Sequence, residues 1–172
     1  LLSIIPSRGP VSGGTIVDIT TSKRQGEKNV EKEEDSNLGC RFGNESASIV
    51  VAAKRISKTI LHCIVPPLEN IVGIVTSSFK SYNVPVEVTF NGIDFTKDSV
   101  SFTYYQNPEI HTIIPNMGSE QGGTSIMIKG IKFPKKCGTT GVLCKFGSEL
   151  SPVDADFEGE GLQFINEIKG GN

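Results

Sequence analysis

Apolar and polar residues alternate along several short stretches of the chain, which is the pattern of strands with one buried face. Residues 59–65 alternate in this way and end at two prolines, and residues 84–90 and 100–105 show similar alternation. No stretch carries the sustained periodicity of an amphipathic helix. The pattern therefore predicts an all-β sandwich of short strands, joined by turns rich in glycine, proline and asparagine.

The strongest turn signal is Asn91-Gly92, a dipeptide that favours the two-residue type I′ turn of a β-hairpin. In that register the apolar side chains on both sides of the turn share one face and the polar ones share the other. The expected inward set is Val88, Phe90, Ile93 and Phe95, and the expected outward set is Glu87, Thr89 and Asp94. With the other strands, this register predicts one core, made of Val17, Ile19, Leu61, Cys63, Val86, Val88, Phe90, Ile93, Phe95 and Phe102.

The chain also repeats itself. Residues 5–19 match residues 114–128 without a gap, and the shared positions include a Gly-Gly-Thr triplet. A second match follows in the same order, because the Cys-x-Phe-Gly of residues 40–43 recurs at residues 144–147. Two ordered matches indicate a tandem array of one structural unit.

We expect a first unit at residues 1–108 and a second, incomplete unit at residues 109–172. Residues 105–114 contain no flexible linker, so the units should abut. Residues 22–36 form a run of mixed charge, which is typical of a solvated loop; docking of a partner is the alternative interpretation.

Charge narrows the classes of partner. The 172 residues include 17 Lys and Arg against 19 Asp and Glu, a formal net charge of −2 at pH 7. Nucleic-acid binding depends on clustered positive charge, so we expect no nucleic-acid partner. No apolar run approaches the roughly 20 residues that span a bilayer, so we expect no membrane insertion of this segment.

Residues that carry catalysis are sparse. His62 and His111 fall in different predicted units, and neither has a nearby cluster of Cys or carboxylates. Ser12 and Ser119 have no His partner at a motif spacing. Both Gly-Gly-Thr turns lead into strands, so they lack the helix N-terminus that binds phosphate. We expect no catalytic, metal-binding or cofactor-binding residues.

Several motifs follow one another in a fixed order along the first unit. They are Pro6, Gly9-Pro10, Gly13-Gly14-Thr15, Cys40-Arg41-Phe42-Gly43, Cys63-Ile64-Val65-Pro66-Pro67, Asn91-Gly92 and Phe102-Thr103-Tyr104-Tyr105. Together they resemble the IPT/TIG family, immunoglobulin-like domains shared by plexins, related growth-factor receptors, fibrocystin-like surface proteins and some Rel-like transcription factors. The resemblance implies tandem immunoglobulin-like β-sandwiches without catalytic residues. The second unit departs from the pattern, since Ser119 replaces the proline and no Cys-x-x-Pro follows Cys144.

Four cysteines allow three disulfide pairings. Cys40 and Cys63 each share strand phase with apolar neighbours, so both should point into the first sandwich. We predict one disulfide between Cys40 and Cys63 and another between Cys137 and Cys144. The alternatives are free structural thiols and metal or redox chemistry, although neither spacing is the Cys-x-x-Cys of zinc sites.

Asn44-Glu45-Ser46 is an N-glycosylation acceptor sequence, and an ordinary turn asparagine is the alternative interpretation. Disulfides and a glycan both favour an oxidising compartment. We therefore predict a non-enzymatic structural or adhesion module of a larger extracellular or cell-surface protein, whose partners are other proteins or further repeats of the same chain. Two alternatives stay open: a dimerisation domain of an intracellular Rel-like DNA-binding protein, and an accessory domain of a secreted carbohydrate-active enzyme.

Overall fold

The structure is a computed structural model of the chain, and it describes residues 3–22, 37–75, 81–133, 142–148, 153–157 and 162–165. Two compact units make up the chain, Leu1–Gln106 and Asn107–Asn172, and each is described by itself. Most of the predicted mixed-charge loop lies outside the described residues.

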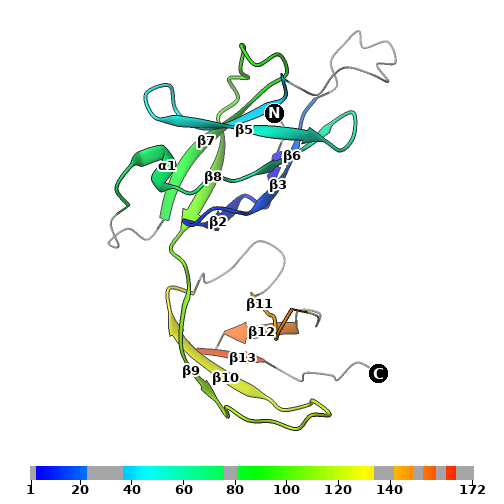
Figure 1. Ribbon diagram of the computed structural model, residues 1–172, viewed down its shortest axis with the longest axis vertical. Coiled ribbons are helices and arrows are strands. Elements are labelled where there is room, and N and C mark those ends of the chain that lie inside the picture. The colour runs from blue at the N-terminus through cyan, green and yellow to red at the C-terminus, as the bar shows by residue number, and fades with distance from the viewer. Residues whose placement is uncertain are drawn as a thin grey trace. The chain divides into compact units, whose positions relative to one another are not determined.

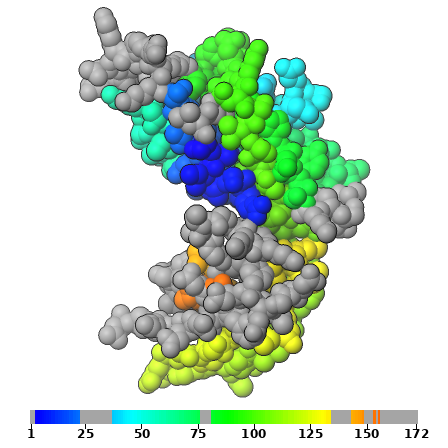
Figure 2. Space-filling view, turned by 180° about the vertical axis from the view of Figure 1, so that it is seen from behind, coloured from blue at the N-terminus to red at the C-terminus, as the bar shows by residue number. Residues whose placement is uncertain are grey.

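The first unit is an immunoglobulin-like β-sandwich, as the sequence predicted (Figure 1). One layer contains β1 (Ser3–Ile5), β3 (Ile16–Thr20) and β6 (Ile60–Ile64). The other contains β2 (Arg8–Pro10), β4 (Gly39–Gly43), β7 (Ser81–Thr89) and β8 (Val100–Tyr105). The N-terminal strands (blue) lie directly against β8 (green) in the space-filling view (Figure 2). A four-residue helix, α1 (Glu69–Val72), follows β6.

Strand β5 (Ser48–Arg55) belongs to both layers. Its first part pairs with β4 as far as Ala52, and its second part pairs with β6 from Ala53 onward. The strand order is therefore continuous through the unit, β1-β3-β6-β5-β4-β7-β8-β2. Because β5 changes partner in mid-strand, it connects the two layers at one side of the sandwich.

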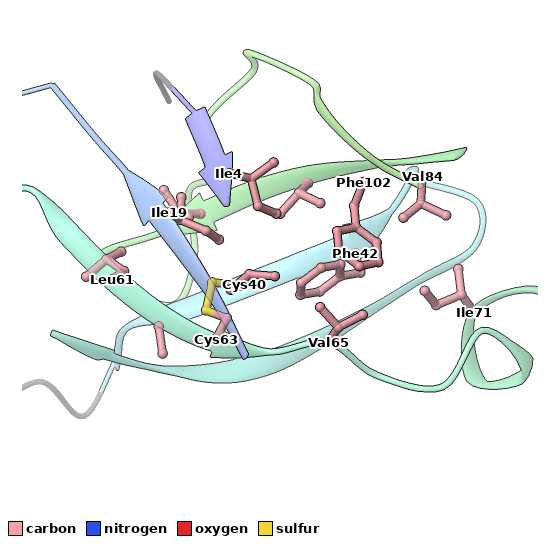
Figure 3. Close-up of a cluster of buried hydrophobic side chains, with 14 of the residues drawn as sticks. Ile4, Ile19, Cys40, Phe42, Leu61, Cys63, Val65, Ile71, Val84 and Phe102 are labelled. Carbon is pink, nitrogen blue, oxygen red and sulfur yellow. A yellow bond between two sulfur atoms is a disulfide. The ribbon is translucent and has the colours of Figure 1, made fainter. Parts of the chain in front are cut away.

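The core lies between the layers and draws apolar side chains from both (Figure 3). The Phe102 ring meets Phe42 edge to face at a centroid distance of 6.1 Å and Tyr104 at 5.1 Å. Such pairs stabilise a core beyond the area that they bury. The predicted core is confirmed for Val17, Ile19, Leu61, Cys63, Val86, Val88 and Phe102.

The predicted two-residue hairpin turn is wrong. Thr89 and Phe95 form an isolated antiparallel bridge, so a longer loop separates them. Asn91 closes this loop with its side chain, because its Oδ1 accepts hydrogen bonds from the N–H groups of Ile93 at 3.0 Å and Asp94 at 2.9 Å. Such local bonds compete with the backbone pairing that a tight hairpin needs.

The altered register changes which side chains are buried. Ile93 is 79% exposed and does not belong to the core, while Phe90 and Phe95 are only partly buried. Glu87 and Thr89, expected on the solvent face of β7, are 3% and 1% exposed. The loop that follows β7 bonds to the outer side of this strand, which is therefore buried on both faces near its end.

The second unit contains a five-stranded sheet of order β11-β12-β13-β10-β9 among the described residues. Its strands are β9 (Glu109–Ile114), β10 (Ile126–Ile131), β11 (Val142–Cys144), β12 (Val153–Phe157) and β13 (Leu162–Ile165). Ile126, Ile128 and Ala155 are its buried apolar residues in the described part.

The sequence repeat is also a structural repeat. The Gly13 N–H donates to the carbonyl of Pro10 at 3.0 Å, and the Gly122 N–H donates to that of Ser119 at the same distance. Both glycines have positive φ, 72° and 80°, a backbone region that side chains disfavour. Serine replaces proline as the first residue of the second turn, and its carbonyl accepts the same bond. The Ser119 hydroxyl also accepts the N–H of Gln121 at 3.2 Å, a bond that proline cannot supply.

Strand register repeats as well. Ile4 lies opposite Ile19 in the first unit, and Ile113 lies opposite Ile128 in the second. Burial differs, because Ile4 is 6% exposed and Ile113 is 40% exposed. The same local sequence pattern therefore forms the same strand pair in both units, although the two pairs differ in burial.

Phe102→Ala should lower the free energy of unfolding by about 3–5 kcal/mol, because it removes a fully buried ring from the middle of the core. Phe90→Ala is the matched control and should cost clearly less, since Phe90 is only partly buried. Urea unfolding of both variants measures the difference. Equal losses would contradict the difference in burial between Phe102 and Phe90.

Tyr104 provides a pH-dependent prediction. Its buried hydroxyl donates to the carbonyl of Pro66 at 2.8 Å, and burial raises the pKa of Tyr104 well above the usual 10.0. An unfolded chain ionises this phenol above about pH 10, whereas the folded chain keeps it protonated. The stability contributed by Tyr104 should be complete below pH about 10 and decline as the pH rises further. Unfolding of wild type and Tyr104→Phe across this range should show the stability difference shrinking; a constant difference would contradict the burial.

Candidate modification site and adjoining groove

Cys40 and Cys63 form a disulfide bond between the two layers of the first unit (Figure 3). The bond joins β4 to β6, with the Cα atoms 6.4 Å apart, inside the ordinary range. Both cysteines pair with residues of β5: Cys40 lies opposite Val51, and Cys63 lies opposite Ala53. The change of partner along β5 thus brings the two cysteines together.

The second predicted disulfide lies partly outside the described residues. Cys144, on β11, is partly buried and forms no disulfide with a residue that the structure describes, and burial raises the pKa of its thiol. Cys137 lies outside the described residues. Pairing of Cys137 with Cys144 therefore stays a prediction.

Asn44 begins the turn between β4 and β5. Its Oδ1 accepts hydrogen bonds from the N–H of Ser46 at 3.1 Å, the hydroxyl of Ser46 at 2.8 Å and the N–H of Ala47 at 2.9 Å. Two of these donors are backbone N–H groups, so the amide atom that faces the turn must be the oxygen. The Nδ2 atom, to which an N-linked glycan attaches, is left without a hydrogen bond to any described residue.

An open groove with a volume of about 490 Å³ adjoins Asn44 on the outer face of the β4–β7 layer. Its base is formed by β4 and β7, and the loop after β7 forms its wall. The residues that line it are Arg41, Gly43, Asn44, Glu45, Pro85, Glu87, Ile93, Asp94, Phe95, Thr96, Lys97 and Ser99.

Glu87 holds the wall of the groove in place. One carboxylate oxygen accepts the Ser99 N–H at 2.6 Å, and the other accepts the Asp98 N–H at 3.3 Å and the hydroxyl of Thr96. Ser99 adopts φ 51°, which is uncommon for a residue other than glycine, and its bond to Glu87 stabilises that conformation. Sequence alternation placed Glu87 facing solvent, and the polar run after Phe95 marks a loop without showing where it folds.

Arg41 lies across the base of the groove. Its guanidinium carbon is 4.3 Å from the centroid of the Phe95 ring, a cation–π contact that orients both side chains. The Arg41 Nε is buried and has no hydrogen-bond partner among the residues that the structure describes. The groove thus presents a fixed aromatic side chain among polar groups of both charge signs.

The outer face of the other layer carries a different surface. His62 Nε2 lies 2.5 Å from Asp18 Oδ1, and the two residues are direct cross-strand neighbours. Next to them Ile16 lies opposite Ile64, and these side chains are 59% and 60% exposed. Within the described ranges there is no group of three or more metal-ligating side chains and no helix long and apolar enough to cross a membrane.

A two-layer sandwich with a Gly-Gly turn feeding its third strand defines an immunoglobulin-like module. The IPT/TIG domain family matches at residues 1–104 and 108–161, so the chain belongs to the IPT/TIG family. No significant match is found among curated proteins.

The solved structures that are similar to the chain include two of Plexin A4. One is the Plexin A4 full extracellular region, domains 1 to 10, with a TM-score of 0.56, 19% sequence identity and 95% of this chain covered. The other is the Plexin A4 full extracellular region with domains 1 to 8, with a TM-score of 0.43, 12% identity and 93% coverage. The chain spans 12% and 21% of the lengths of those chains. At 19% identity, the first likeness shows the fold.

Replacing Glu87 tests the anchoring of the loop. Glu87→Ala should cost about 1–3 kcal/mol, because it removes a buried carboxylate that accepts the backbone N–H groups of Asp98 and Ser99. Hydrogen exchange at the amides of Asp98 and Ser99 should accelerate. Glu87→Gln is the matched control, since its amide oxygen retains one acceptor. Its stability and its exchange rates should lie between those of wild type and Glu87→Ala. Unchanged exchange in Glu87→Ala would show that another group holds the loop.

Proposed function

We propose that this chain is a non-enzymatic protein-interaction module in the extracellular part of a larger cell-surface or secreted protein. The Cys40–Cys63 disulfide carries the proposal, because disulfides persist in oxidising compartments and are rare in the cytosol. Membership of the IPT/TIG family and the fold shared with a plexin extracellular region support it.

Exposed apolar residues support the interaction role. Ile5, Ile16 and Ile64 share the outer face of the β1–β3–β6 layer, and each is at least 59% exposed. Clustered apolar side chains at a protein surface are typical of protein–protein contacts. The partners are other proteins or further repeats of the same chain.

The two alternatives differ in what they require. A dimerisation domain of an intracellular Rel-like protein would work in a reducing compartment, and the buried disulfide counts against it. An accessory domain of a secreted carbohydrate-active enzyme would share the oxidising compartment. That alternative requires a catalytic domain in the same molecule, since fold alone does not define function.

The experiment labels intact cells that make the native protein with a membrane-impermeant biotin reagent and detects it with an antibody against residues 1–106. The expected result is biotinylated protein at the cell surface or protein in the medium, while a cytosolic control protein stays unlabelled. Protein found only in the cytosol or nucleus would overturn the proposal. Glycoside-hydrolase activity of the isolated native molecule would favour the enzyme alternative.

A further inference from the structure

The groove beside Asn44 contains an apolar side chain that the fold leaves uncovered. Ile93 is 79% exposed and lines the groove together with Phe95. Removing an exposed isoleucine side chain from water is favourable, so this wall favours an occupant with an apolar face. Asp94, Thr96 and Lys97 stand along the same wall and offer both hydrogen-bond donors and acceptors.

The size and rigidity of the groove suit a small ring. Its volume of about 490 Å³ falls within the range of about 300–1,000 Å³ typical of small-molecule sites. Glu87 anchors the loop at Thr96 and Ser99, and Asn91 closes it at Ile93. Because the wall is ordered before anything binds, an occupant loses little free energy in ordering it.

One occupant is attached to the groove by the sequence itself. Asn44 lines the groove, and its Oδ1 accepts the hydrogen bonds from Ser46 and Ala47. Its Nδ2 is then the amide atom that bonds to no described residue. A sugar attached to that nitrogen is held next to the groove at a high effective concentration. Weak contacts are then sufficient to keep it there.

We propose that the first sugar of an N-linked glycan on Asn44 folds back into this groove, packs against Ile93 and Phe95, and stabilises the loop after β7. An N-acetylated sugar has the required chemistry, with apolar ring and methyl surfaces beside hydroxyl groups that the polar wall residues can bond. The glycan is then an integral part of this face and covers it against protein contact. The inference rests on the extracellular location proposed above, because the glycan is added only in the secretory pathway.

The experiment compares secreted residues 1–172 in three forms: with the whole glycan, trimmed to the single Asn-linked sugar, and without a glycan. Asn44→Gln and Ser46→Ala supply two independent glycan-free forms, and Ser46→Ala keeps the Asn44 side chain. Mass spectrometry measures occupancy of Asn44, and hydrogen exchange measures protection of the amides of residues 93–99. We expect several-fold slower exchange in the single-sugar form than in either glycan-free form, and little further change with the whole glycan.

Ile93→Ser should abolish this protection without changing occupancy. Ile74→Ser is the matched control, because Ile74 is 91% exposed and does not line the groove. Full occupancy with equal exchange in all forms would overturn the inference, and the groove would then be open to another molecule. A bare Asn44 in secreted, disulfide-bonded protein would also overturn it while leaving the proposed function intact. Native protein confined to the cytosol would overturn both.

Discussion

The passage of β5 from one layer to the other is the constraint on which the first unit depends. This strand pairs with β4 up to Ala52 and with β6 from Ala53, so the two layers cannot separate without breaking a continuous strand. The same crossing brings Cys40 and Cys63 within reach of each other, and their disulfide fastens the layers from the core side. Phe42, Phe102 and the apolar residues of β3 and β6 then fill the enclosed space.

The groove on the outer face of the first unit depends on Glu87, a polar residue that is buried although alternation places it on the solvent face. Glu87 faces outward on β7, yet it is buried because the following loop folds over it and donates backbone hydrogen bonds to its carboxylate. The loop leaves a groove between itself and β4 and displays Ile93 to solvent. The geometry of this surface therefore depends on one buried carboxylate more than on apolar packing.

Much of this fold could be predicted from the sequence, because its strongest signals are periodic. Alternation identified the inward faces of β3 and β6, and the matched turns identified the repeat, even where Ser119 replaces Pro10. Strand phase also turned Cys40 and Cys63 inward, and both are buried.

The loop after β7 could not be predicted in this way. Asn91-Gly92 is a strong local signal for a tight turn, but the Asn91 side chain bonds within the loop and moves the pairing to Thr89 and Phe95. Alternation assigns each residue to a face without indicating that a later loop will cover the outer one. The groove at Asn44 was missed for the same reason, since it is formed by residues distant in sequence.

The most direct test of this account is peptide mapping of the native protein under non-reducing conditions, with free thiols blocked before digestion. The account predicts a linked pair of peptides that contain Cys40 and Cys63, released by reduction. Blocked free thiols at both positions would contradict the compartment inferred from the disulfide. Either cysteine linked to Cys137 or Cys144 would contradict the crossing at β5, which places Cys40 beside Cys63.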